Sequence, residues 1–141
     1  MHNGPVAISD LSVLLENLSV RRRPGRWCMV SDVTVPDGLA VATIVEDEGL
    51  TSVVSMADAE RLGLEPAFIA AWLTLEVNSA LEAVGLTAAV ATALAVEGIA
   101  CNVLAGYHHD HLLVRLDCAE RAISAIEGLR SSPRTERDDA H

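Results

Sequence analysis

Four consecutive residues carry the strongest chemical signal in the sequence: His108, His109, Asp110 and His111. Imidazole and carboxylate groups are good ligands for zinc and nickel. Four adjacent residues of one turn cannot all converge on a single ion without contorting the backbone, and no second cluster supplies further ligands. A structural role, with these side chains hydrogen-bonding the turn, is therefore favoured, and a metal-binding protein or metal-dependent enzyme that uses this hairpin remains the alternative.

Other catalytic signatures are absent from the sequence. It contains no Ser-His-Asp order, phosphate-binding loop, HExxH helix or nucleotide-binding glycine pattern. Cys28, Cys101 and Cys118 are widely spaced without a CxxC pair, which is typical of small buried residues in a reducing compartment. We therefore expect neither catalysis nor a cofactor.

Composition limits the classes of protein that remain. The 141 residues suffice for one ordinary domain or two small ones, and 50% hydrophobic content excludes wholesale disorder. A net charge of −10 disfavours nucleic acids and anionic membranes as partners, because both are polyanionic. No signal peptide and no apolar run of about 20 residues is visible, so a cytoplasmic protein is expected.

The first half of the chain predicts a helix, three strands and a second helix. Leucines at spacings of three and four indicate a helix after its N-cap Ser9. The arginines of residues 21–26 surround Pro24-Gly25 and predict a solvated turn. Short strands are expected at residues 27–35, 39–45 and 50–55, paired as an antiparallel meander. Ser55 then caps a short helix.

The second half predicts strand, helix, strand, strand and helix. A strand over residues 68–78 is followed by a helix at 85–97, then by strands at 99–105 and 111–116. Asp117 and Glu120 form a capping-box pattern for the last helix. Residues 131–141 are polar and charged, and we expect them to be disordered. The chain is thus predicted to be α+β, with antiparallel strands and helices on one face.

Three segments of this second half carry a resemblance to a known family. They are TLEVNSALEAVGLT at residues 74–87, GIACNVLAGY at 98–107 and HDHLLV at 109–114. Together they resemble the ACT domain superfamily, and in particular small bacterial proteins made of two ACT-like halves. His108 and Arg115 depart from the pattern, which usually has an aromatic residue and a proline at those positions.

The resemblance implies a ferredoxin-like βαββαβ fold, an N-terminal ACT-like half at residues 8–66 and a C-terminal ACT domain at 67–130. It also implies a non-catalytic regulatory homodimer that binds a small molecule, with an amino acid as the expected ligand, through the loop at residues 78–87. A helix start offers unpaired N–H groups to a ligand carboxylate. The expected ligand-binding residues are Glu76, Asn78, Ser79, Val84, Gly85, Leu86, Thr87 and Asn102. Besides the metal site, a ligand-free interaction module that pairs through sheet edges remains an alternative.

Overall fold

The computed structural model describes residues 10–77, 80 and 83–130. Its strands form one six-stranded antiparallel sheet in the order β2-β3-β1-β4-β6-β5. The strands are β1 (Val20–Ser31), β2 (Ala42–Glu46), β3 (Gly49–Ser55), β4 (Ile69–Leu75), β5 (Asn102–Ala105) and β6 (Asp110–Arg115). The α-helices are α1 (Leu11–Glu16), α2 (Met56–Arg61), α3 (Leu86–Val96) and α4 (Ala119–Glu127). The antiparallel α+β architecture predicted from the sequence is confirmed.

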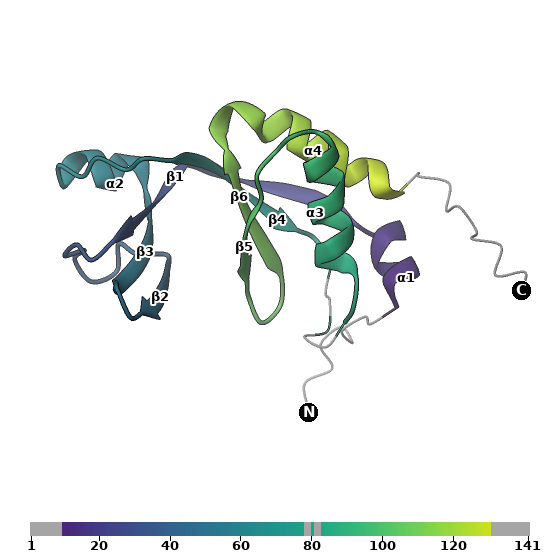
Figure 1. Cartoon of the computed structure of the whole chain (residues 1–141), viewed down its shortest axis with the longest axis horizontal. Helices are drawn as coiled ribbons and strands as arrows, with labels where there is room; N and C mark the ends of the chain where they lie inside the picture. The colour runs from purple at the N-terminus through teal and green to yellow at the C-terminus, as the bar shows by residue number, and fades with distance from the viewer. Residues whose placement is uncertain (1–9, 78–79, 81–82, 131–141) are drawn as a thin grey trace, which may run out of the picture.

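The long central strand β1 joins the two ends of the sheet. It pairs with β3 through residues 27–31 and with β4 on its other side. Figure 1 shows the result, with α2, β2 and β3 at one end of the molecule and α1, α3 and α4 at the other. Because one strand serves both ends, the sheet is continuous across the boundary expected near residue 66.

The prediction of a turn at the arginines was wrong, because residues 21–26 lie inside β1. The turn-forming pair Pro24-Gly25 is absorbed as an irregularity, where the pairing register with β4 shifts between Arg23 and Trp27. Three of the four arginines have acidic partners elsewhere in the fold, and Arg23 lies against two tryptophan rings. Arg21 pairs with Glu76, and Arg22 with Glu120.

The predicted meander was also wrong, since β1 pairs with β3 rather than with β2. β1 ends at Ser31, and the connection at residues 32–41 carries the chain past the position of β3 to the outer edge. The tight turn between Glu46 and Gly49 then returns it as a hairpin. β2 is therefore an edge strand.

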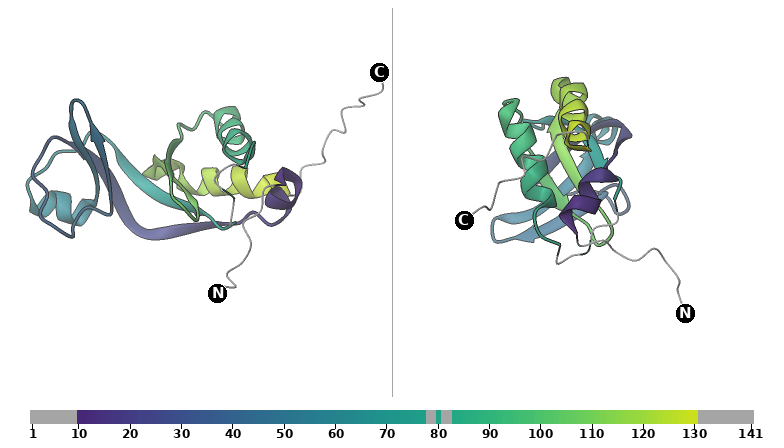
Figure 2. Two further views of the ribbon diagram at one scale, coloured as in Figure 1. Left: turned by 90° about the horizontal axis from the view of Figure 1, so that it is seen from below. Right: turned by 90° about the vertical axis from the view of Figure 1, so that its right-hand side faces the viewer.

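The helices lie on one face of the sheet, and the strand residues that alternate toward that face build the core beneath them. Leu73 of β4 and Leu112 of β6 pack with Leu14, Leu94 and Ile126 of α1, α3 and α4. A smaller core under α2 comprises Cys28, Val30, Val54, Met56 and Ala59. Figure 2 shows α3 and α4 side by side above the strands. No described helix is both long enough and apolar enough to cross a bilayer.

Helix starts agree with the sequence in part. Ser55 caps α2 by accepting from the N–H of Asp58 at 3.1 Å, as predicted. The cap of α1 is Asp10, which accepts from Ser12 at 2.8 Å, whereas the predicted cap Ser9 lies outside the described residues. The predicted capping box of α4 is not formed. Asp117 instead accepts from Arg115 at 2.7 Å, and a short 3₁₀ turn (Leu116–Cys118) precedes the helix.

The opposite face of the sheet carries no helix among the described residues and has its own apolar cluster. Trp27, Val53, Ala70, Trp72 and Leu113 are buried there. The sheet curves so that Ala42, at the start of β2, and Leu104 of β5 both pack against this cluster. The curved face is thus a second packed layer, in addition to the helix layer.

Candidate functional site

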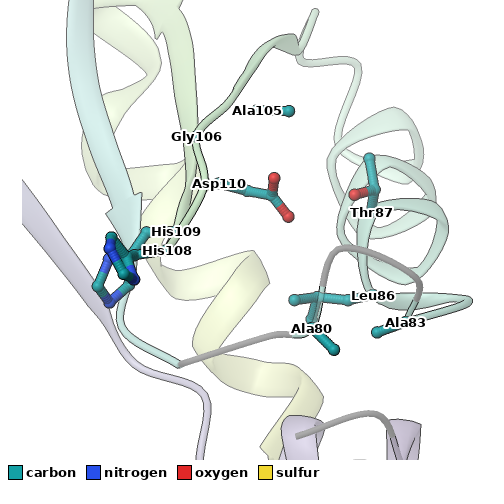
Figure 3. Close-up of a pocket in the computed structure, with 9 residues that line it drawn as sticks. All are labelled: Ala80, Ala83, Leu86, Thr87, Ala105, Gly106, His108, His109 and Asp110. Atoms are coloured by element: carbon teal, nitrogen blue, oxygen red, sulfur yellow. The ribbon is translucent and has the colours of Figure 1, made fainter. Parts of the chain in front are cut away.

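A pocket of about 180 Å³ lies between the start of α3 and the β5–β6 hairpin. Figure 3 shows the helix on one side and the hairpin on the other. The lining residues are Ala80, Ala83, Leu86, Thr87, Ala105, Gly106, His108, His109 and Asp110. This volume is small beside the roughly 300–1,000 Å³ of pockets for drug-sized ligands, so it suits a ligand of few atoms.

The helix side of the pocket offers hydrogen-bond donors. Gly85 is the N-cap of α3, with φ of 104°, and provides no side-chain cap. The first bonded amide is that of Ala89, which donates to the carbonyl of Gly85 at 2.9 Å. Among the described residues, none accepts from the N–H groups of Leu86, Thr87 or Ala88. These amides and the helix dipole favour an anion at this end of the pocket.

The hairpin side of the pocket offers a carboxylate. Asp110 is the first residue of β6 and pairs with Ala105, so both face α3. Figure 3 shows its carboxylate extending from the hairpin toward Thr87. The Gly106 N–H closes the turn by donating to the carbonyl of His109 at 2.9 Å. A Cβ at Gly106 would lie 2.8 Å from that same oxygen, so this turn requires glycine.

The histidine cluster is divided between the two faces of the sheet. His108 and His109 line the pocket, whereas His111 points to the face opposite Asp110 because successive strand residues alternate. There its Nδ1 lies 3.2 Å from the indole Nε1 of Trp72 and 2.9 Å from Oγ1 of Thr74. Burial, followed by the charge of His109, lowers the pKa of His111. The described residues contain no group of three or more potential metal ligands.

The structure brings some of the predicted ligand-binding residues to this pocket. Leu86 and Thr87 line it directly. Gly85 adjoins it, but the close neighbour of its α-carbon is the protein's own α1. A Cβ there would lie 2.9 Å from Cδ2 of Leu11. The predicted Asn78 and Ser79 lie outside the described residues.

Three other predicted residues lie away from the pocket. Val84 is 83% exposed and points to solvent. Glu76 forms an ion pair with Arg21. Asn102 is on the helix-free face, where its Nδ2 donates to the carbonyl of Leu113 at 3.4 Å.

Sequence reasoning gave Asp110 a structural role in the turn, with a metal site as the alternative, and missed its place as the acid of this pocket. The alternation of side chains along β6 could have shown this. Leu112 and Val114 face the helices, and Asp110, two residues before Leu112, lies on the same face of the strand. The strand was predicted to start at His111, one residue too late. Extending the alternation to Asp110 places the side chains of Asp110 and His111 on opposite faces of the sheet.

Comparison with known proteins bears on both halves of the chain. ACT domain models match residues 68–128 and residues 6–71. A crystal structure of a Vibrio cholerae protein of unknown function, described as a possible transport protein, is 39% identical. The match covers 85% of this chain and 95% of that one, with a TM-score of 0.76. No curated protein matches the chain significantly.

More distant similarity extends to structures of aspartate kinase subunits. The ligand-free regulatory subunit of aspartate kinase from Thermus thermophilus is 12% identical, with 78% of this chain and 95% of that one covered at a TM-score of 0.56. A structure of aspartokinase alpha and beta subunits is 14% identical, with 80% and 97% covered at a TM-score of 0.58. At these identities the likeness establishes the fold alone. The two family matches show that the chain belongs to the ACT domain superfamily and contains two ACT-like halves.

Proposed function

We propose that this protein is a non-catalytic sensor that binds a small amino acid in the pocket between α3 and the β5–β6 hairpin. The observation that carries the proposal is the pairing of opposite chemistries across one small cavity. Helix amides for which no described residue is an acceptor lie on one side, and the carboxylate of Asp110 extends from the other. ACT domains support a small-molecule-binding regulatory role in general.

The arrangement fits a zwitterion better than a simple anion. A ligand carboxylate at the N–H groups of Leu86 and Thr87 gains about 0.3–1 kcal/mol from the helix end, and up to about 2 kcal/mol where partly buried. A ligand ammonium group would then pair with Asp110, and without it the negative charge of Asp110 would repel the ligand. The small residues Ala80, Ala83 and Ala105 leave room for a short side chain.

Thermal unfolding in the presence of each of the twenty amino acids tests the proposal. A ligand at 100 times its Kd stabilises the native state by about 2.7 kcal/mol, which raises Tm measurably. We expect the responding amino acid to lose its effect when its amine is acetylated or its carboxylate is converted to an amide. A folded protein whose Tm responds to none of the twenty would contradict the proposal.

Asp110→Asn tests the assigned orientation, with Asp47→Asn as the matched control. Both changes remove one negative charge, but Asp47 is exposed in the distant β2–β3 turn. We expect Asp110→Asn to weaken amino-acid binding at least tenfold and Asp47→Asn to change it less than twofold. Equal affinity in both variants would show that the ammonium group is held elsewhere.

We further propose that the sensor acts as a homodimer, with 8–66 and 67–130 as the bounds of its two halves. The support is the apolar exposure of the edge strand β2, where Val45 is 87% and Ile44 48% exposed. An unpaired strand edge recruits another chain. Light scattering should give twice the chain mass, and Val45→Lys should shift it toward the monomer. A monomeric wild type at micromolar concentration would exclude the dimer.

A further inference from the structure

A second pocket, of about 320 Å³, lies on the helix-free face of the sheet. Its polar side chains are Arg23 of β1 and His111 of β6, and the ring of Trp72 lies between their positions in the sheet. Val41, Ala42 and Leu104 provide apolar walls. None of the described residues that line it is acidic, in contrast to the pocket beside α3.

Arg23 differs from every other described arginine in having no acidic partner among the described residues. Seven arginines form ion pairs: Arg21, Arg22, Arg26, Arg61, Arg115, Arg121 and Arg130. The guanidinium of Arg23 instead lies over two indole rings, 4.6 Å from the centroid of Trp27 and 4.8 Å from that of Trp72. Cation–π attraction to these two rings holds the guanidinium in this place. Its N–H edge has no acceptor among the described residues and can bind a carboxylate in bidentate fashion.

His111 supplies a second oriented donor. The indole N–H of Trp72 can only donate, so Nδ1 of His111 is the acceptor and the ring proton lies on Nε2. A Cβ at Gly106 would lie 3.3 Å from that Nε2, which places the nitrogen beside a glycine that also lines the pocket. Burial lowers the pKa of His111 and so favours this neutral, donating form.

We propose that this pocket binds a small organic carboxylate with an apolar body, held by the guanidinium of Arg23 and the Nε2–H of His111. An amino acid is disfavoured, because no lining residue offers its ammonium group a carboxylate. The apolar walls favour an alkyl chain over a bare inorganic anion. The ligand therefore differs in class from the zwitterion proposed for the pocket beside α3, and the two sites can be tested separately.

Intrinsic fluorescence reports on this site selectively, because both tryptophans of the chain, Trp27 and Trp72, contact Arg23. The titrants are butyrate, its neutral counterpart butyramide, and inorganic phosphate, at constant ionic strength. We expect a saturable change with butyrate alone. No saturation below about 100 mM butyrate, or an equal response to butyramide or phosphate, would overturn the proposal.

Arg23→Gln removes the charge and the fork of donors, and Arg26→Gln is its matched control. Arg26 is exposed on the same strand and paired with Glu60. We expect Arg23→Gln to weaken butyrate binding at least tenfold, and Arg26→Gln less than twofold. Equal weakening of butyrate binding in both variants would indicate that butyrate responds to the net charge of the protein rather than to a specific site at Arg23.

Circular dichroism establishes whether Arg23→Gln folds. If it does not, nitrogen-15 spectra of the wild type decide. Butyrate should shift the Nε2 resonance of His111 and leave those of His108 and His109 in place. Uniform shifts of all three would contradict the proposal. Asp110→Asn should retain butyrate binding, because Asp110 lines only the pocket beside α3. This variant therefore shows whether the butyrate proposal and the amino-acid proposal fail independently.

Discussion

The two faces of the β5–β6 hairpin differ in chemistry although adjacent residues supply them. Asp110 turns a carboxylate toward the start of α3, and His111 turns an imidazole toward Trp72 and Arg23. One pocket combines an acid with helix amides, whereas the other contains donors only. A cluster that is continuous in sequence is therefore two half-sites in space, because strand geometry alternates side chains with a period of two.

The two faces also differ in how firmly their side chains are held. Trp72 is 4% exposed, contacts Trp27 edge-on at 5.5 Å between centroids, and donates to His111. By contrast, Thr87 is exposed and Asp110 is only half-buried. Substitutions on the helix-free face should therefore lower stability, whereas those of Thr87 and Asp110 should mainly change ligand affinity.

The largest expected effect is that of Trp72→Ala, which tests the packed face. Removing a buried aromatic ring from such a cluster costs about 3–5 kcal/mol. The variant also loses the contact of this ring with Arg23 and the hydrogen bond that Trp72 donates to His111. Urea denaturation should show this loss in the free energy of unfolding. Asp110→Asn should change the same quantity by less than about 0.5 kcal/mol. If the two variants lose similar stability, the contrast between the faces is incorrect.

Gly85→Ala has a smaller expected effect and shows what fixes the start of α3. Both Gly85 and Gly63 have positive φ, at 104° and 70°, but only Gly85 has a close neighbour, Leu11. Gly63→Ala should therefore cost only the left-handed backbone strain of about 1–2 kcal/mol. Gly85→Ala should cost up to about 1 kcal/mol more, because the tip of the Leu11 side chain must move aside.

A double-mutant cycle checks that cause. Leu11→Ala removes the methyl group that a Cβ at Gly85 would meet, so the two changes should be non-additive in the free energy of unfolding. Additive costs, or equal costs for Gly85→Ala and Gly63→Ala, would show that α1 does not hold the start of α3. In that case the space beside Gly85 would be available to a ligand.

Much of the fold could be predicted from local pattern. Leu73 and Leu75 alternate clearly, and they lie in β4 as expected. Ser55 and Gly85 mark helix starts correctly, because a cap depends on residues within one turn. The position of β1 could not be predicted, because the arginines around Pro24-Gly25 resemble a solvated turn. Their ion-pair partners Glu76 and Glu120 are far away in the sequence. Sequence spacing does not reveal such distant partners.

The site was predictable to a lesser degree, for the same reason. Leu86 and Thr87 were identified because a helix start has a local signature. The relation of Arg23 to Trp72 was missed, because it depends on the β1–β4 register, which pairs residues 49 positions apart. Asn102 was chosen for its unusual position in a strand, yet the amide bonds the neighbouring carbonyl of Leu113. Polar residues within strands need the pairing register before a role can be assigned.

The smallest expected effect is a pH dependence of stability from His111. Burial holds its pKa below the ordinary 6.5, so the unfolded chain binds the proton more readily than the native state. The stabilising contribution is therefore complete above about pH 6.5 and is lost as pH falls through the lowered folded-state pKa. The charged groups acting on it are His109, Arg23 and Arg21, which lower its pKa, and Asp110, which raises it.

His111→Gln isolates this contribution, because other titrating groups are common to both proteins. Between about pH 7.5 and 5.5, the free energy of unfolding should fall more for the wild type than for the variant. Asp110→Asn should steepen the fall, since it removes the one charge that raises the pKa of His111. An unchanged fall in Asp110→Asn would mean that Asp110 and His111 are not electrostatically coupled across the hairpin, and a shallower fall would mean that the sign of the coupling is wrong. Parallel pH profiles of wild type and His111→Gln would show that the imidazole is not neutral and buried against Trp72.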